Sequence, residues 1–132
     1  MLKIVVTGAA GRMGRRLVAN IHEDPELVLA GATEWSGSTL LGADAGEVAG
    51  VGTLGVKIAA SLEEALADGA DIVIDFSTGD VAANASAAAA KGCGIVIGTT
   101  ALKPEQKAVL HELADKGARI VQSYNYSVGV NL

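Results

Sequence analysis

Three regularly spaced glycines near the N-terminus could hold a ligand that carries phosphate groups. The run Gly8-Ala9-Ala10-Gly11-Arg12-Met13-Gly14 lies between an apolar segment and a segment with helical periodicity. Because the first N–H groups of a helix have no partner within it, such a junction can bind the pyrophosphate of a dinucleotide. Gly8 would permit the tight turn, Gly11 a close approach of the backbone to the phosphates, and Gly14 close packing of the helix. The spacing is G-x-x-G-x-x-G rather than the commoner G-x-G-x-x-G, so an ordinary glycine-rich turn is the alternative.

An acidic residue, Glu34, follows the second apolar segment and stands 20 residues after Gly14. A carboxylate at this distance accepts hydrogen bonds from the hydroxyls of an adenosine ribose and repels a 2′-phosphate. We therefore predict that Glu34 binds the ribose, with a solvated surface charge as the alternative. Trp35, the next residue, either stacks on the adenine or covers the end of the strand.

Polar and glycine-containing segments follow three later apolar segments. They are Asp75-Phe76-Ser77, Gly98-Thr99-Thr100 and Tyr124-Asn125-Tyr126. The carboxyl ends of parallel strands form the edge at which open α/β sheets bind ligands, so we expect all three at one site. Gly98 would admit a ring close to the backbone, and the threonine hydroxyls could hold an amide or a carboxylate. Structural turns, and aromatic side chains that cover the sheet, are the alternatives.

Other chemistries are not indicated. His22 and His111 fall on separate predicted helices without metal-ligand spacing, so no metal site is expected. No Ser, His and Asp arrangement indicates a hydrolase, and no Lys stands in a Walker pattern. The single Cys93 cannot form an intramolecular disulfide, and it is expected to pack as a small hydrophobic residue in a reducing compartment.

Alternating strand and helix patterns must position the candidate residues. The strands are predicted at Met1–Thr7, Leu27–Ala32, Val56–Ala59, Ile72–Ile74, Ile95–Ile97 and from Ile120 onward. The helices are predicted at Arg12–His22, from a capping box at Ser61 and Glu64 to about Gly69, at Val81–Lys91 and at Pro104–Lys116. Residues 35–55 are polar and glycine-rich with little periodicity, and such long loops are usually functional or mobile. The alternation predicts an α/β fold of Rossmann type, a doubly wound parallel sheet with helices on both faces.

The composition fits one domain that spans residues 1–132. Half of the residues are hydrophobic but only 3% are aromatic, so Val, Ile, Leu and Ala must build the core. The net charge of −5 argues against nucleic acid or an anionic membrane as a partner. No apolar stretch approaches the roughly 18 residues of a membrane span, and no signal peptide is visible. We therefore expect a soluble cytoplasmic protein.

The whole sequence resembles the N-terminal domain of dihydrodipicolinate reductases, also called 4-hydroxy-tetrahydrodipicolinate reductases. The most specific elements are G-R-M-G at residues 11–14 and N-Y-S-V-G-V-N at residues 125–131. The other matching stretches are V-T-G-A-A at 6–10, G-S-T-L-L-G-A-D-A-G at 37–46, D-F-S at 75–77 and G-T-T at 98–100. These stretches agree with the family in both order and spacing.

The resemblance implies a reductase in which NAD(H) or NADP(H) delivers hydride to a cyclic imine-type dicarboxylate, in lysine and diaminopimelate biosynthesis. By this similarity, residues 8–13 would hold the pyrophosphate and Glu34 the adenosine ribose. The residues implied at the nicotinamide end are Phe76, Gly98, Thr99, Thr100, Ser123, Tyr124, Asn125 and Tyr126. Thr100 is also implied to contact the substrate.

Several departures from the family pattern shape the expectations. Some members carry a basic residue at the position of Trp35, where it can meet the 2′-phosphate of NADP. The lack of this positive charge here favours NADH over NADPH, although Arg12 could partly compensate. Tyr126 stands in place of the usual Phe, and Ala101 in place of the usual Gly.

The family's second domain, with its H-H-R-x-K and K-x-D-A-P-S-G-T stretches, is absent from this sequence, which we interpret as cut off at Leu132. We therefore expect no catalytic residue in this chain and no turnover by it alone. Dicarboxylate binding and the family's homotetramer would need that second domain. The N-terminal domain of another dehydrogenase, or a free-standing dinucleotide-binding module, are the alternative interpretations.

Overall fold

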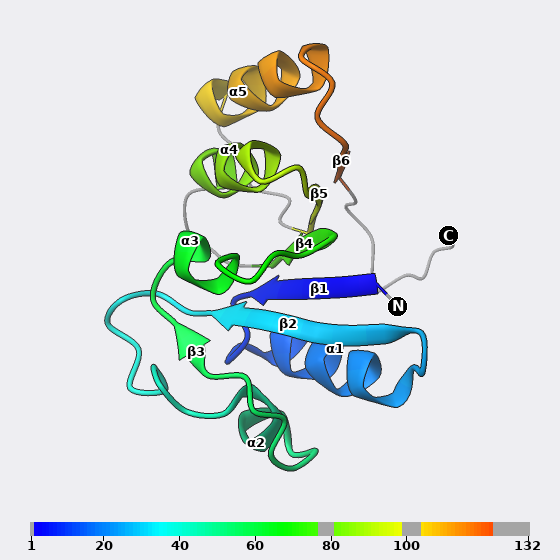
Figure 1. The fold of residues 1–132 in the computed structure, drawn as a ribbon. Helices are drawn as coiled ribbons and strands as arrows, with labels where there is room; N and C mark the ends of the chain where they lie inside the picture. Colours follow the sequence, from blue (N-terminus) through cyan, green and yellow to red (C-terminus); the bar gives the residue numbers. More distant parts are fainter. Residues whose placement is uncertain (1, 77–80, 99–103, 123–132) are drawn as a thin grey trace.

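Six short strands form one sheet in the part of the chain that the computed structural model describes, residues 2–76, 81–98 and 104–122 (Figure 1). The strands are β1 (Leu2–Thr7), β2 (Leu27–Thr33), β3 (Ile58–Ala59), β4 (Ile72–Asp75), β5 (Gly94–Ile97) and β6 (Ile120–Gln122). Their spatial order is β3-β2-β1-β4-β5-β6, and all the pairings between them are parallel. The order reverses between β1 and β4, so the carboxyl ends of these two strands flank the switch point where such sheets bind ligands.

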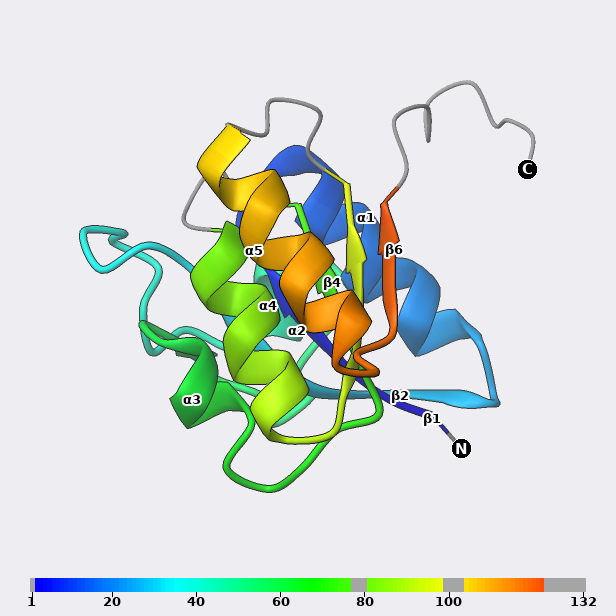
Figure 2. The same ribbon diagram turned by 90° about the horizontal axis from the view of Figure 1, so that it is seen from above.

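Helices cover both faces of the sheet (Figure 2). Helices α1 (Arg12–Glu23) and α2 (Ala45–Ala49) contribute to the core on one face, and α3 (Leu62–Ala65), α4 (Val81–Ala90) and α5 (Pro104–Asp115) to the core on the other. Strand β1 serves both cores, because Ile4 and Val6 pack on the α1 side and Val5 on the opposite side. The predicted doubly wound sheet with helices on both faces is thereby confirmed.

An irregularity in β2 brings α3 close to the sheet. Ile4 pairs with Leu29, but the next residue of β1, Val5, pairs with Gly31, so β2 contains one extra residue at this point. A Cβ atom on Gly31 would lie 2.7 Å from the carbonyl oxygen of Ala65 at the end of α3. Gly31 therefore permits a close contact between helix and strand, and the sequence pattern did not indicate it.

The segment 35–55, predicted to have little periodicity, contains the short helix α2. Asp44 caps this helix, and its carboxylate accepts four backbone N–H groups. The donors are Gly46 at 2.9 Å, Glu47 at 3.2 Å, Leu54 at 3.0 Å and Gly55 at 2.7 Å. Asp44 is followed three residues later by Glu47, which is a capping pattern that could have revealed the helix. A single side chain thus joins the start of α2 to the backbone near residues 54–55.

The capping interaction predicted at the start of α3 is confirmed. The Ser61 hydroxyl oxygen accepts the Glu64 N–H at 3.2 Å. The helix is shorter than predicted, because it ends at Ala65, but turns continue to Gly69, whose φ of 85° lies in the left-handed region.

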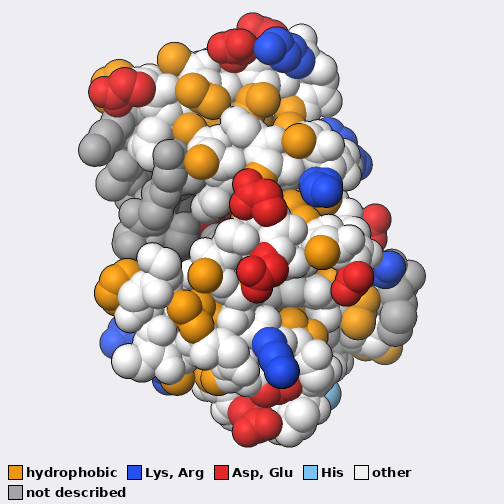
Figure 3. All heavy atoms as spheres, turned by 60° about the vertical axis from the view of Figure 1, so that its left-hand side comes forward, with side chains coloured by type: hydrophobic (Ala, Val, Ile, Leu, Met, Phe, Trp, Pro, Cys, Tyr) orange, Lys and Arg blue, Asp and Glu red, His pale blue; other side chains and the backbone are white. Residues whose placement is uncertain are grey.

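Charges are mixed on the molecular face that Figure 3 shows. Acidic and basic side chains are interspersed there, and lysines and arginines do not form a continuous basic area on that face. Within the described ranges, none of the helices is both long enough and apolar enough to cross a membrane.

Candidate functional site

The loop between β1 and α1 is tied to the end of β2 through its own backbone. Gly8 has a φ of 74°, in the region that favours glycine. The N–H groups of Gly8 and Ala9 both donate to the Thr33 carbonyl oxygen at 3.0 Å. The Gly11 N–H donates to the Gly8 carbonyl oxygen at 3.1 Å. These donors are already used within the protein, so the loop offers a ligand its shape rather than these N–H groups.

The beginning of α1 offers donors that are free. Gly11 caps the helix without a side chain that could accept a hydrogen bond, and the first helical bond runs from the Arg15 N–H to the Gly11 carbonyl oxygen. In the described part of the chain, the N–H groups of Arg12, Met13 and Gly14 have no protein acceptor. Three free N–H groups at the positive end of a helix dipole can hold an anion such as a pyrophosphate.

The structure constrains Gly14 and Gly11 differently. A Cβ atom on Gly14 would overlap the Gly8 carbonyl oxygen and lie 2.7 Å from the Ala9 Cα, so the helix can reach the loop only with glycine here. Gly11 has an ordinary φ of −75°, and its Cβ would meet only the Gly8 carbonyl oxygen, at 3.4 Å. The protein alone gives little reason for glycine at position 11, whereas a ligand that approaches the backbone would need it.

The Glu34 carboxylate lies against this loop. Its Oε2 accepts the Ala10 N–H at 2.8 Å, and its Oε1 accepts the Trp35 N–H at 3.3 Å. The backbone N–H of Glu34 donates to the Ala59 carbonyl oxygen at 3.0 Å, which fixes the end of β2 beside β3. A carboxylate offers about four lone-pair directions, so it has capacity left for the hydroxyls of a ribose.

Trp35 does not cover the end of the strand. Its side chain is 70% exposed, and its ring lies over Gly37, where a Cβ atom would overlap it. An exposed aromatic ring next to Glu34 is available to a flat ligand such as adenine.

A buried carboxylate lies beneath the same edge of the sheet. Asp75, the last residue of β4, is fully buried. Its Oδ1 accepts the Thr7 hydroxyl at 2.6 Å, and its Oδ2 accepts the Asn84 side-chain amide at 3.0 Å. Asp75 therefore connects the ends of β1 and β4 to α4. Sequence reasoning placed Asp75 at this edge but did not anticipate these partners, although an acid directly after a buried apolar strand was a usable signal.

Phe76 and Gly98 lie together beyond the ends of β4 and β5. A Cβ atom on Gly98 would overlap the Phe76 ring, and the Gly98 N–H donates to the Asp75 carbonyl oxygen at 2.8 Å. The structure thus brings two of the residues expected at the nicotinamide end into contact. The other residues expected there lie outside the described ranges: Thr99, Thr100, Ser123, Tyr124, Asn125 and Tyr126.

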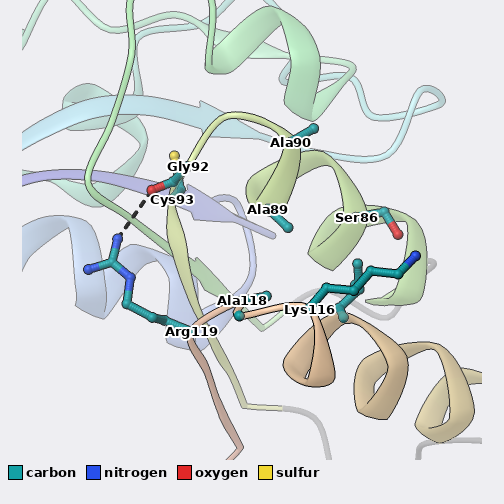
Figure 4. Close-up of a pocket in the computed structure, with 10 residues that line it drawn as sticks. Ser86, Ala89, Ala90, Gly92, Cys93, Lys116, Ala118 and Arg119 are labelled. Carbon is teal, nitrogen blue, oxygen red and sulfur yellow. Dashed lines mark hydrogen bonds between the residues drawn. The ribbon is translucent and has the colours of Figure 1, made fainter.

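A pocket of about 390 Å³ lies at the opposite edge of the sheet, where β5 and β6 begin (Figure 4). It is formed between the last turns of α4 and α5, and the Arg119 guanidinium beside it donates to the Gly92 carbonyl oxygen at 3.1 Å. Cys93 is buried at this pocket, and burial raises the pKa of its thiol, which donates to the Ala70 carbonyl oxygen at 3.1 Å. Because strand carboxyl ends are the usual binding edge, we do not assign the candidate site to this pocket.

His22 and His111 stand on α1 and α5, on opposite faces of the sheet. Among the residues that the structure describes, no group of three or more His, Cys, Asp and Glu side chains is arranged to hold a metal ion.

The strand order, the glycine loop at the start of α1 and the acid at the end of β2 together define a Rossmann dinucleotide-binding domain. A family model described as the N-terminus of dihydrodipicolinate reductase matches residues 2–126. The chain belongs to this family, and the resemblance noted in the sequence is confirmed.

Curated relatives and a solved structure agree with this assignment. The 4-hydroxy-tetrahydrodipicolinate reductase of Anaeromyxobacter dehalogenans is 47% identical over 133 residues, which cover 100% of this chain and 48% of the relative. That of Pseudomonas fluorescens is 48% identical over 134 residues, which cover 100% of this chain and 49% of the relative. Dipicolinate-bound dihydrodipicolinate reductase from Paenisporosarcina has the same fold, with a TM-score of 0.77 at 19% identity over 98% of this chain and 49% of that chain. The chain thus spans about half the length of these relatives.

Proposed function

We propose that this chain is the dinucleotide-binding part of a 4-hydroxy-tetrahydrodipicolinate reductase and that it binds NAD(H) in preference to NADP(H). One observation carries the proposal: three free N–H groups at the start of α1 lie next to a loop that is hydrogen-bonded to the Glu34 carboxylate. The free N–H groups suit a pyrophosphate, and the Glu34 carboxylate suits the hydroxyls of a ribose. Membership of the family supports the same function.

In this proposal the N–H groups of Arg12, Met13 and Gly14 bind the pyrophosphate. The loop from Gly8 to Gly11 provides a surface without bulky side chains, over which the phosphates lie. Glu34 accepts hydrogen bonds from the adenosine ribose through lone pairs that its bonds to the protein leave available.

The preference for NAD(H) rests on charge. A 2′-phosphate would lie close to the Glu34 carboxylate, and the two negative charges would repel each other. The neighbouring residue, Trp35, supplies no positive charge to offset this repulsion. The exposed Arg12 is the residue that would weaken the preference.

At the other end of the site, Phe76 and Gly98 would form the wall against which a nicotinamide packs, since glycine admits a ring close to the backbone. A bound nicotinamide supplies the hydride for reduction of the cyclic imine-type dicarboxylate. We place Thr99, Thr100 and residues 123–126 at the same end by family similarity, with Thr100 also in contact with the substrate.

The catalytic acid and the groups that bind the dicarboxylate are expected in the half of the relatives that this chain does not span. We propose the same half as the source of the homotetramer contacts. A cytoplasmic location also remains part of this proposal.

A calorimetric titration with NADH and with NADPH tests the cofactor proposal. We expect NADH to bind at least about tenfold more tightly, which corresponds to ~1.4 kcal/mol. Glu34→Gln keeps an acceptor oxygen for the Ala10 N–H but removes the charge, so NADPH binding should improve and the difference should narrow. Glu63→Gln on α3 is the matched control, because it removes one exposed negative charge on the opposite face.

The titrations distinguish the preference for NAD(H) from dinucleotide binding itself. Equal affinities for the two dinucleotides would contradict the preference for NAD(H) and leave dinucleotide binding intact. A chain that binds neither would contradict the function itself.

A further inference from the structure

Charged side chains hold the tip of the glycine loop from both sides. The Ala10 N–H donates to Glu34, and the Arg15 Nε donates to the Ala10 carbonyl oxygen, both at 2.8 Å. The Gly11 N–H, which shares a peptide plane with that carbonyl, donates to the Gly8 carbonyl oxygen at 3.1 Å. Both ends of the Ala10–Gly11 peptide are therefore fixed, directly before the free N–H groups of α1.

Arg15 makes this contact from the surface of α1 and contributes nothing to the buried core. Its side chain is exposed, and within the described residues its two terminal guanidinium nitrogens have no hydrogen-bond or ion-pair partner. Arg16, the next residue, is also exposed and carries the same charge, but its side chain makes no hydrogen bond to the described residues. The pair therefore allows the contact to Ala10 to be separated from the effect of charge alone.

We propose that Arg15 is a positioning residue for pyrophosphate binding, because its Nε holds the Ala10–Gly11 peptide in the orientation that presents the first amides of α1. The inference rests on the proposed function and adds a residue that the glycine pattern does not contain. Donors that are already oriented need no further ordering when a ligand binds. Without the Arg15 contact the peptide could rotate, and dinucleotide binding would have to restore its orientation.

Arg15→Met and the control Arg16→Met test this role in titrations with NADH and NADPH. Arg15→Met should lower the affinity for both dinucleotides by about tenfold, which is the effect expected for loss of a hydrogen bond from a charged donor. Arg16→Met should lower these affinities by less than about threefold. About 0.5 M salt should abolish the effect of Arg16→Met, because the Arg16 charge is exposed. The loss in Arg15→Met should persist at that salt concentration, with a melting temperature within about 2 °C of the unaltered chain.

Amide hydrogen exchange of the ligand-free protein gives a second measure of loop order. The Gly11 N–H should exchange faster in Arg15→Met than in the unaltered chain, and it should be unchanged in Arg16→Met. Equal losses of affinity in the two variants, or a loss that salt removes in both, would show that Arg15 acts only as a charge and would overturn the inference. Unchanged Gly11 exchange would also overturn it.

The same measurements distinguish this inference from the proposed function. If the unaltered chain binds NADH and Arg15→Met binds it equally well, only the role of Arg15 is wrong. If the unaltered chain binds neither dinucleotide, the proposed function and this inference fail together.

Discussion

Gly8, Gly11 and Gly14 stand three residues apart, the first two in the loop before α1 and Gly14 in the first turn of α1, but the fold constrains them differently. Gly8 has the positive φ that side chains disfavour, and Gly14 lies where a Cβ atom would overlap the loop backbone. Gly11 meets neither condition, so we expect that glycine is needed at position 11 only when a ligand binds. Substitution at these positions should therefore separate folding from binding.

We predict that Gly14→Ala destabilises the fold while Gly11→Ala impairs binding. Gly14→Ala should reduce the free energy of unfolding by about 2 kcal/mol, because the new methyl group overpacks the contact between helix and loop. Gly11→Ala should change the free energy of unfolding by less than about 1 kcal/mol, but this substitution should weaken NADH binding by at least about tenfold. Urea unfolding and calorimetry measure the two effects, and normal NADH affinity in Gly11→Ala would contradict the proposed approach of the phosphates.

The sequence predicted the positions of some residues of the candidate site, but it did not predict the contacts that other residues make. The glycines and Glu34 follow from spacing along the chain, because a short loop after a strand leaves few possible geometries. The contacts of Arg15 to Ala10 and of Asp75 to Thr7 depend on where side chains point after folding. Spacing along the chain carries no information about that orientation.

Among the elements, the segment that contains α2 depends most on a single residue. The Asp44 carboxylate holds both the start of α2 and the backbone near residues 54–55. The hydrogen bond from the Leu54 N–H is the main cause that lowers the pKa of Asp44 below its usual value of 3.8, and the bonds from the other three N–H groups act in the same direction against the effect of burial. The ionised form is therefore the one that stabilises this segment.

A dependence on pH follows from this pKa. Because the folded-state value is lowered, the stabilisation is fully present above the ordinary value of 3.8 and is lost as the pH falls through the lower, folded-state value. Amide exchange at Leu54 and Gly55 should show protection that is high near neutral pH and decreases in this acidic range. Asp44→Asn should reduce the protection near neutral pH and should resemble the unaltered chain at the acidic end.

Asp68→Asn provides the matched control for this experiment, since Asp68 is an exposed aspartate in the turns after α3. It should leave exchange at Leu54 and Gly55 unchanged at every pH. Protection in Asp44→Asn equal to that of the unaltered chain near neutral pH would contradict the role assigned to Asp44.

At the scale of the whole molecule, the described residues form one sheet with a core on each face, and the candidate site lies along a single edge of it. The chain spans about half the length of its curated relatives. A domain of this kind can bind and orient a dinucleotide, but reduction also requires groups that bind the dicarboxylate and donate a proton. We propose that those groups lie in the other half of the relatives.

We predict that the chain alone binds NADH but does not reduce the cyclic imine-type dicarboxylate. A chimera in which this chain replaces the corresponding 133 residues of the Anaeromyxobacter dehalogenans reductase should be active, since the two are 47% identical over that length. NADH consumption measured by absorbance compares the chain, the chimera and the relative. Turnover by the chain alone would contradict the proposed division of roles.

The sequence by itself determined the alternation of strands and helices, the position of the glycine loop and the family. These depend on local periodicity, on turn residues and on short motifs, which neighbouring residues carry. Only the tertiary structure decided which amides of the loop are free, how β2 accommodates α3 and which groups surround Asp75. The physical reason is separation along the chain: Glu34 meets Ala10 across 24 residues and Asp75 meets Thr7 across 68, contacts that exist only once the strands have paired.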